Sequence, residues 1–368
     1  MRLRNDRALN LLWACLFIAL TTSVLSSEAS TPQSTPTPAA SATPRPGQTD
    51  QAPSPSPGQT SSPQGSQASA PAAARPEQPS QEQAPASDNS VFVFKKEVEE
   101  VVLHATVADN KNHLIMNLDK DAFTVLENNQ AQAITSFRHE DIPVAMGIVI
   151  DNSGSMREKR DKVNKAALNL VRSSNPQDQV FVVNFNDEYY LDQPFTSNLN
   201  LLREALEKVE ARGGTALYDA IVASAEYEKK QARLQKKVLF VVTDGEDNAS
   251  QETLEKAVRR LQEENGPTVY AIGLLGEERA RRARRALETI AERTGGMVFL
   301  PKTLDEVDEI SRSVAHDIRS QYTIGYKPST PKNVGGYRTI HVEARAKGFR
   351  QLTVRTRSGY YPGQETSQ

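Results

Sequence analysis

Residues 144–156 read "VAMGIVIDNSGSM". The stretch begins with a nearly continuous apolar run, which is typical of a strand that is covered on both faces. It ends with Asp151, Ser153 and Ser155, three oxygen-bearing side chains on alternate positions. Alternate side chains of an extended loop point the same way, and Gly154 permits a sharp turn into a following helix. The pattern therefore predicts a binding site at the carboxyl end of a buried strand.

From residue 143 to residue 320, strand and helix patterns alternate strictly. Further apolar runs with strand character are "QVFVVNF", "KVLFVVT", "TVYAIGLL" and "MVFL". Helical spacing lies between them, for example in "ALYDAIVASAEY" and in the stripe Val307, Ile310, Val314 and Ile318. Such alternation predicts an α/β domain with a doubly wound, mostly parallel sheet and helices on both faces.

The flanks of this region have β character. Residues 91–142 predict several antiparallel strands, two of them joined by a turn at Asn128-Asn129, because Asn tolerates the left-handed conformation. Residues 321–362 contain the strand-like runs "QYTIGYK", "YRTIHVEARA" and "RQLTVRTRSGYY", followed by a tail at 363–368. Together the flanks have the strand count of a sandwich. We therefore expect one β-sandwich, built from both flanks, with the α/β domain inserted in it.

The N-terminal residues predict export. Arg2, Arg4 and Arg7 precede an apolar run from Leu11 to Leu20 and then small residues, with a cleavage pattern that ends at Ala29. This order is that of a secretory signal peptide, here residues 1–29. The apolar run is short for a membrane span of about 20 residues, so an uncleaved anchor is the second interpretation. Residues 30–90 are rich in Pro, Ser, Gln and Ala and predict a disordered linker. We expect a secreted, periplasmic or cell-envelope protein.

The composition excludes several functions. Lys and Arg number 44 against 46 Asp and Glu, so no net field favours nucleic acid or an anionic membrane. Cys15, the only cysteine, lies in the predicted signal, which leaves no disulfide, thiolate metal site or cysteine nucleophile in the mature chain. The five histidines show no zinc-ligand spacing.

Two further stretches place oxygen donors where the first one does. Thr215 lies in "RGGTALYDA" ahead of a helix, and Asp244 ends the strand-like run "KVLFVVTD". Ligands of doubly wound sheets bind at the carboxyl ends of the strands. Asp151, Ser153, Ser155, Thr215 and Asp244 would together offer two carboxylates and three hydroxyls. This set suits Mg²⁺, with Mn²⁺ or Ca²⁺ as alternatives. Neutral hydroxyl ligands would leave positive charge for an anionic oxygen, such as a carboxylate of a partner protein.

Each of these signals also has a purely structural interpretation. Residues 155–158, "SMRE", form a capping-box pattern that would make Ser155 a helix N-cap. Asp244-Gly245 could be an ordinary turn, and Thr215 only a helix start. Asp219, on the helix after Thr215, is expected to be a loop anchor. A metal site explains all three stretches at once, in the order that the strands predict.

The pattern Asp151-Asn152-Ser153-Gly154-Ser155, with Thr215 and Asp244, resembles the metal-ion-dependent adhesion site of von Willebrand factor type A (VWFA) domains. "GGTALYDAI" and "TDGEDNAS" are similar to family patterns as well. The flanks resemble those of a bacterial family of exported VWFA-related proteins, which has glycine where this chain has Asn112 and Asn129. The resemblance implies direct metal contact by Ser153, Ser155 and Thr215. It implies contact by Asp151 and Asp244 either directly or through water.

These patterns together predict a non-enzymatic, metal-dependent protein-binding module of adhesion or scaffold type. A GxSxG elbow, a histidine base and a second metal cluster are all missing from the sequence, which argues against an enzyme. Two alternatives stay open. One is a structural envelope protein in which the metal only stabilises loops, and the other is a metal-dependent hydrolase.

Overall fold

A computed structural model describes residues 100–276 and 280–363 of the chain. Its central feature is a six-stranded sheet with the strand order β10-β9-β8-β5-β6-β7. All neighbouring strands are parallel except β7, which runs antiparallel to β6. The strands are β5 (Val144–Asp151), β6 (Gln179–Phe185), β7 (Tyr189–Thr196), β8 (Lys236–Thr243), β9 (Thr268–Gly273) and β10 (Met297–Phe299). The predicted doubly wound, mostly parallel sheet is confirmed.

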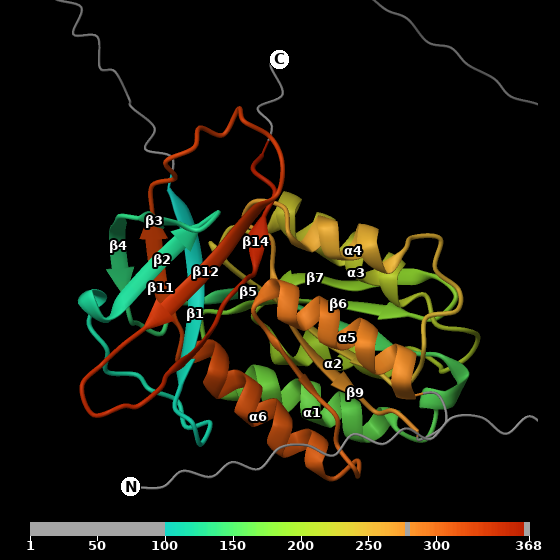
Figure 1. The fold of residues 1–368 in the computed structure, drawn as a ribbon. Coiled ribbons are helices and arrows are strands. Elements are labelled where there is room, and N and C mark those ends of the chain that lie inside the picture. Colours follow the sequence, from blue (N-terminus) through green and yellow to red (C-terminus); the bar gives the residue numbers. More distant parts are fainter. Residues whose placement is uncertain (1–99, 277–279, 364–368) are drawn as a thin grey trace, which may run out of the picture. The chain divides into compact units, whose positions relative to one another are not determined.

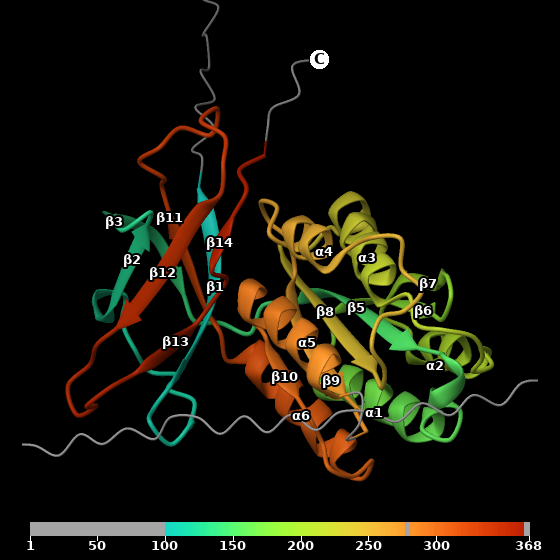
Figure 2. The same ribbon diagram turned by 45° about the vertical axis from the view of Figure 1, so that its right-hand side comes forward.

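Six helices cover both faces of this sheet (Figures 1 and 2). They are α1 (Arg160–Ser173), α2 (Leu199–Glu207), α3 (Leu217–Gln231), α4 (Leu254–Leu261), α5 (Ala280–Thr294) and α6 (Glu306–Arg319). On one face α1, α2 and α6 pack in a core with Met146, Ile148 and Ile150 of β5. On the other face α3, α4 and α5 pack in a core with Val149. Every residue of β5 is buried, which explains its continuous apolar run.

A third core lies between two four-stranded antiparallel sheets. Their orders are β13-β1-β11-β4 and β14-β12-β2-β3. Strands β1 (Val101–Ala108), β2 (Phe123–Glu127), β3 (Gln130–Gln132) and β4 (Ile134–Arg138) precede the six-stranded sheet in sequence. Strands β11 (Tyr322–Tyr326), β12 (Arg338–Ala344), β13 (Thr353–Arg355) and β14 (Gly359–Tyr360) follow it. Because β1 pairs with β11 and β13 while β2 pairs with β12, each sheet combines both flanks. The predicted β-sandwich with an inserted α/β part is therefore confirmed.

The structure differs from the sequence prediction in two strands. Residues 350–361, predicted as one strand, form β13 and β14 in different sheets, because residues 356–358 turn toward the α/β part, where Arg357 donates to the Leu261 carbonyl. Strand β7 was missed, because five of its eight residues are exposed and Pro194 interrupts it. Such a proline is tolerated on an edge strand.

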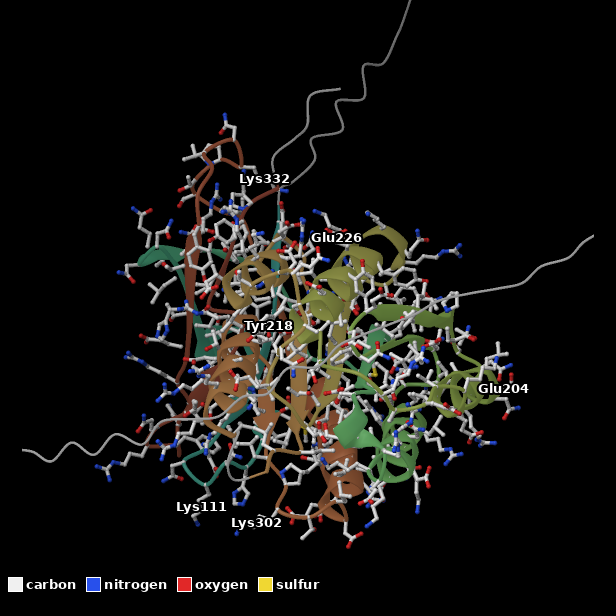
Figure 3. The ribbon with its side chains drawn as sticks, turned by 90° about the vertical axis from the view of Figure 1, so that its right-hand side faces the viewer. Lys111, Glu204, Tyr218, Glu226, Lys302 and Lys332 are labelled. Atoms are coloured by element: carbon white, nitrogen blue, oxygen red, sulfur yellow. The ribbon has the colours of Figure 1, made fainter. Side chains whose placement is uncertain are left out.

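Charged side chains of the described residues point to solvent. Lys111, Glu204 and Lys302 are exposed and point outward from three different loops and helices (Figure 3). None of the helices in residues 100–276 and 280–363 is both long and apolar enough to cross a bilayer. The predicted signal peptide (1–29) and linker (30–90) lie outside the described residues, and the predicted domain boundaries remain predictions.

Candidate metal site

Asp151 is the last residue of β5 and is completely buried. Its Oδ1 accepts a hydrogen bond from the Ser153 backbone N–H at 2.8 Å, and its Oδ2 accepts one from the Thr243 hydroxyl at 2.6 Å. Burial raises the pKa of the Asp151 carboxyl, although the bonds from Thr243 and Ser153 oppose this shift. The carboxylate thus joins the ends of β5 and β8 and shapes the loop that follows β5.

Ser153 and Ser155 lie on that loop, next to Asp244 at the end of β8. Their hydroxyl oxygens are 3.2 Å apart, and the Ser155 hydroxyl donates to Asp244 Oδ1 at 2.8 Å. Ser155 lies in a short 3₁₀ turn, η2 (Gly154–Met156), whereas α1 begins only at Arg160. Ser155 is therefore not the N-cap of α1, and its hydroxyl is turned toward the carboxylate across 89 positions of sequence.

Thr215 reaches the same place from the loop before α3. Gly213 has a φ of +75°, a conformation that favours glycine, and its carbonyl accepts from the Gly154 backbone N–H at 3.2 Å. The Thr215 backbone N–H donates to Asn248 Oδ1 at 2.9 Å. A Cβ atom on Gly245 would lie 3.3 Å from the Thr215 hydroxyl oxygen, so this hydroxyl faces the turn that follows Asp244.

These segments surround one cavity of about 780 Å³, whose lining includes Ser153, Ser155, Thr215 and Asp244. Asp151 does not line the cavity but lies directly behind it, bonded to Ser153. The structure thus brings together four of the predicted residues and places the fifth in contact with them. The cavity is at the carboxyl ends of β5 and β8, where doubly wound sheets bind ligands.

The residues present fit a hard divalent cation. The side chain of Asp244 is only 1% exposed, and the Lys159 ammonium group forms an ion pair with its Oδ2. Lys159 is thus the positive charge that balances Asp244 in the donor cluster. The donors are carboxylate and hydroxyl oxygens, the ligand type that Mg²⁺, Mn²⁺ and Ca²⁺ prefer. Among the described residues, no group of three or more His, Cys, Asp or Glu side chains could hold a metal. A metal ion at this place would therefore need hydroxyl ligands in addition to carboxylates.

Several residues that the sequence analysis did not select hold this site together. Besides Lys159, Thr243 and Asn248, they include Asp187, whose Oδ1 accepts from the Gly214 backbone N–H at 2.8 Å. Asp187 and Asn248 follow strand ends, a position that could have marked them as candidates. Asp219 is the expected loop anchor, since its carboxylate oxygens accept from the Gln251 and Glu252 backbone N–H groups at 2.9 and 2.8 Å.

Residues 146–246 match a family model for the von Willebrand factor type A domain. Residues 146–246 are therefore VWFA-type sequence, and the α/β part that contains them is named the VWFA domain. The match covers β5, the Thr215 loop and Asp244, and so includes all five predicted site residues. VWFA domains are generally modules for protein–protein interaction rather than enzymes, and those with a metal-ion-dependent adhesion site bind divalent cations.

The proteins that this chain is similar to have low sequence identity with it. An uncharacterized protein of Synechocystis sp., sll0103, is 24% identical over 141 residues, 36% of this chain and 34% of the relative, so the chain spans about a third of that protein. A VWFA structure from Catenulispora acidiphila is 16% identical, with a TM-score of 0.42, and covers 71% of this chain and 73% of its own. Proximal thread matrix protein 1 of the mussel byssus, with zinc in its metal-ion-dependent adhesion site motif, is 20% identical. Its TM-score is 0.42, over 52% of this chain and 50% of its own.

Proposed function

We propose that the protein is an exported, non-enzymatic binding module that holds a divalent cation and recruits an acidic group of a partner protein. Ser153, Ser155 and Thr215 would hold the metal directly, and Asp151 and Asp244 directly or through water. A bound cation would supply a positive charge with a coordination position open to the carboxylate of the partner. Mg²⁺ is the cation that we propose first, with Mn²⁺ or Ca²⁺ as alternatives.

One observation carries this proposal: the hydroxyls of Ser153 and Ser155 and the Asp244 carboxylate form one hydrogen-bonded chain in a cavity that Thr215 also lines. These residues come from three segments that are far apart in sequence. A capping box, a turn and a helix start, the separate structural interpretations, do not require such a meeting. A shared ligand does.

The charges around the cavity also support recruitment of an anion. Two further acids, Glu246 and Asp247, line the cavity, and both have partners. Arg282 forms an ion pair with Glu246, and Asp247 accepts from the Tyr218 backbone N–H and the Ser250 hydroxyl. The charge of Glu246 is therefore paired with a cation, and the carboxylate of Asp247 is occupied by hydrogen bonds. A cation bound at the hydroxyl groups could then still attract a carboxylate.

Thr215 offers a sharp test, because two substitutions separate its hydroxyl from its shape. In calorimetric titrations of the mature chain with Mg²⁺, Mn²⁺, Ca²⁺ and Zn²⁺, Thr215→Val should weaken binding of the preferred ion at least about tenfold. Thr215→Ser keeps the hydroxyl and should bind nearly as the wild type. Ser155→Ala should weaken binding as well, while Ser313→Ala, at an exposed position of α6, should change nothing. Equal metal affinity in Thr215→Val and wild type would overturn the proposal.

Partner binding then separates this function from a purely structural metal. Capture of a partner from envelope extract should be lost both on chelation and in Thr215→Val, but not in Thr215→Ser. If chelation only lowered the melting temperature and left capture unchanged, the metal would serve to stabilise loops. Metal-dependent turnover of an ester or phosphate substrate would instead favour the hydrolase.

Export is the remaining part of the proposal, and it rests on residues 1–29. N-terminal sequencing of the protein from its native cells should find a chain that begins at Ser30. A chain recovered in the membrane with Met1 intact would support the uncleaved anchor, and one recovered in the cytoplasm would exclude export.

A further inference from the structure

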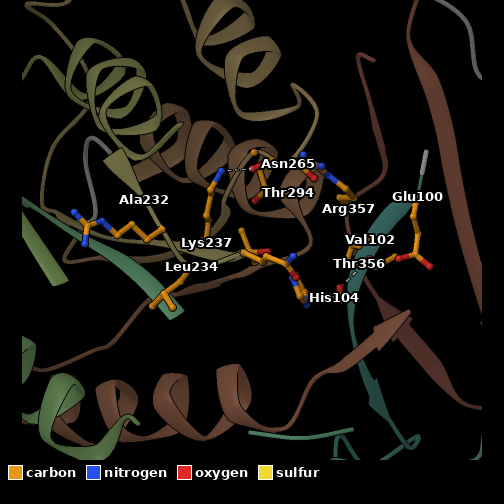
Figure 4. Close-up of a pocket in the computed structure, with 14 residues that line it drawn as sticks. Glu100, Val102, His104, Ala232, Leu234, Lys237, Asn265, Thr294, Thr356 and Arg357 are labelled. Carbon is orange, nitrogen blue, oxygen red and sulfur yellow. Dashed lines mark hydrogen bonds between the residues drawn. The ribbon is translucent and has the colours of Figure 1, made fainter. Parts of the chain in front are cut away.

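A second cavity lies at the other end of the strands of the six-stranded sheet from the candidate metal site, near the amino end of β8. It has a volume of about 440 Å³ and is lined by residues of β1, of β8, of the loop after α4 and of the segment between β13 and β14. Strand β1 belongs to the sandwich and β8 to the VWFA domain, so this is a cavity at their junction. Figure 4 shows Lys237 and Arg357 approaching Asn265 from opposite sides, with His104 below them.

The cavity contains two positive charges, those of Lys237 and Arg357, that form no ion pair with a carboxylate among the described residues. Arg357 is only 8% exposed, and its Nη2 donates to the carbonyls of Leu261 and Glu263 at 3.1 and 3.2 Å. Lys237 Nζ donates to the Asn265 carbonyl at 3.3 Å. Among the described residues, neither cation forms an ion pair with an acid. A buried charge with only carbonyl partners is costly, and a carboxylate or phosphate oxygen would offset that cost.

The acids near the cavity do not provide this compensation. Glu100, the one acid that lines it, accepts hydrogen bonds from the hydroxyls of Thr135 and Ser136 at 2.5 and 2.8 Å. Glu228 of α3 lies behind Lys237 and is completely buried. Burial raises the pKa of Glu228 well above its usual value, which favours the neutral acid. Burial lowers the pKa of Arg357 to about 10, and the nearby Glu264, which is itself paired with Lys332, opposes this shift only in part. The positive charge of the cavity is thus only partly compensated.

His104 is a further polar group of the cavity, and its pKa is lowered by its surroundings. Burial, assisted by the positive charges of Lys236 and Arg357, lowers its pKa from 6.5 to about 3. The imidazole is therefore neutral near pH 7. Its Nδ1 is 3.4 Å from the Thr323 hydroxyl oxygen, and its Nε2 has no hydrogen-bond partner within residues 100–276 and 280–363. A neutral imidazole can donate from one nitrogen, so His104 could bind an anion together with the two cations.

We propose that this junction cavity binds a small molecule through an oxyanion, a phosphate or a carboxylate group, held by Lys237, Arg357 and His104. The volume is within the range of small-ligand pockets, about 300–1,000 Å³, and exceeds that of a single phosphate ion. Since Lys237 belongs to the VWFA domain while His104 and Arg357 belong to the sandwich flanks, the anion would connect the two parts. The proposal does not depend on the metal site.

The test uses His104 as the reporter, with inorganic phosphate and acetate as the probes. The imidazole resonances of the mature chain are followed by NMR during titration with each anion, with sodium chloride at equal ionic strength as the reference. At pH 7, where both probes are anionic, saturable shifts of the His104 resonances should appear. Burial lowers the pKa of His104, and a nearby anion, which favours the protonated imidazole, should raise it again. His113, whose side chain is 72% exposed, should not respond. The probe that binds more tightly would show whether the cavity prefers a phosphate or a carboxylate group.

A matched pair of lysine variants completes the test. Lys237→Gln removes a cavity cation, whereas Lys230→Gln removes an exposed charge of α3 that does not line the cavity. Anion affinity should fall about tenfold in Lys237→Gln and stay unchanged in Lys230→Gln. Arg357 is not substituted, because loss of its hydrogen bonds to two backbone carbonyls could destabilise the fold. No saturable shift of His104 with either anion, or equal affinity in both lysine variants, would overturn the proposal.

Discussion

Lys159 is the residue that most affects the charge of the candidate metal site. Its ammonium group contacts the Asp244 carboxylate. Its side chain is 28% exposed, so solvent reaches part of the lysine. A divalent ion at the hydroxyl groups of Ser153 and Ser155 would be repelled by this ammonium group and would compete with it for the carboxylate. Lys159 can therefore lower metal affinity without contacting the metal.

Replacing this lysine should strengthen metal binding. In Lys159→Met the repulsion is lost while most of the side-chain volume remains, and we expect Mg²⁺ to bind about fivefold more tightly. The measurement is a calorimetric titration with Mg²⁺. Lys165→Met, at an exposed lysine of α1, the helix that begins directly after Lys159, is the control and should leave the affinity unchanged. Weaker binding in Lys159→Met than in wild type would mean that the lysine supports the site.

The oxygen donors of the candidate metal site could be predicted because their spacing and their positions after strands have a geometric reason. Lys159 could not be predicted. A long flexible side chain in "REKRDK" can extend in many directions, and its contact with Asp244 spans 85 positions of sequence. Asn248 was missed for a related reason, because the backbone group that it supports, the Thr215 N–H, is distant in sequence.

Among the elements, the hairpin of β2 and β3 is held by a turn of two asparagines. Asn128 and Asn129 have φ values of 49° and 64°, which is the left-handed pair that a type I′ turn requires. Asn112, in the turn after β1, also has a positive φ of 64°. Asparagine thus adopts, at these turns, the left-handed conformation that otherwise favours glycine.

The energetic consequence can be measured at Asn129, which is exposed. Asn129→Ala places a residue with a Cβ and no local hydrogen bonding at positive φ, and should lower the free energy of unfolding by about 1 kcal/mol. Asn129→Gly should be close to neutral, because glycine adopts this conformation without strain. Urea denaturation gives both values, with Asn110→Ala, at a position without positive φ, as the control. Equal stability of the alanine and glycine variants would show that this turn does not limit stability.

How well an element could be predicted depended on its burial. Strand β5 is buried throughout, so its apolar run defines it without ambiguity. The exposed edge strand β7 has no such signal, since neither face of it requires apolar residues. The separation of β13 from β14 depends on contacts with the VWFA domain, such as that between Arg357 and Leu261, which no local pattern reveals.

In the whole molecule, one buried acid joins the VWFA domain to the sandwich. Asp317 of α6 accepts hydrogen bonds from Arg355 Nη2, of β13, at 2.6 and 2.7 Å and also one from the Tyr270 hydroxyl of β9. Asp317 is 7% exposed, and Gln321 donates to the same tyrosine at 3.1 Å. Burial of the ring, and after it the negative charge of Asp317, raise the pKa of Tyr270 well above its usual value. The network thus couples three elements that belong to both parts of the fold.

Loss of this acid should therefore affect cooperativity as well as stability. Asp317→Ala leaves Arg355 without its carboxylate partner, and breaking such a buried pair costs about 3 kcal/mol. We expect urea unfolding, followed by near-UV and far-UV circular dichroism, to show coincident transitions in wild type and separate ones in the variant, because the two cores would no longer be coupled. Asp305→Ala breaks an ion pair with Lys162 in which Asp305 is 84% exposed, and should change stability by less than about 1 kcal/mol. A single transition in Asp317→Ala, displaced no further than in Asp305→Ala, would mean that the two cores are coupled mainly by their chain connections at β4–β5 and α6–β11.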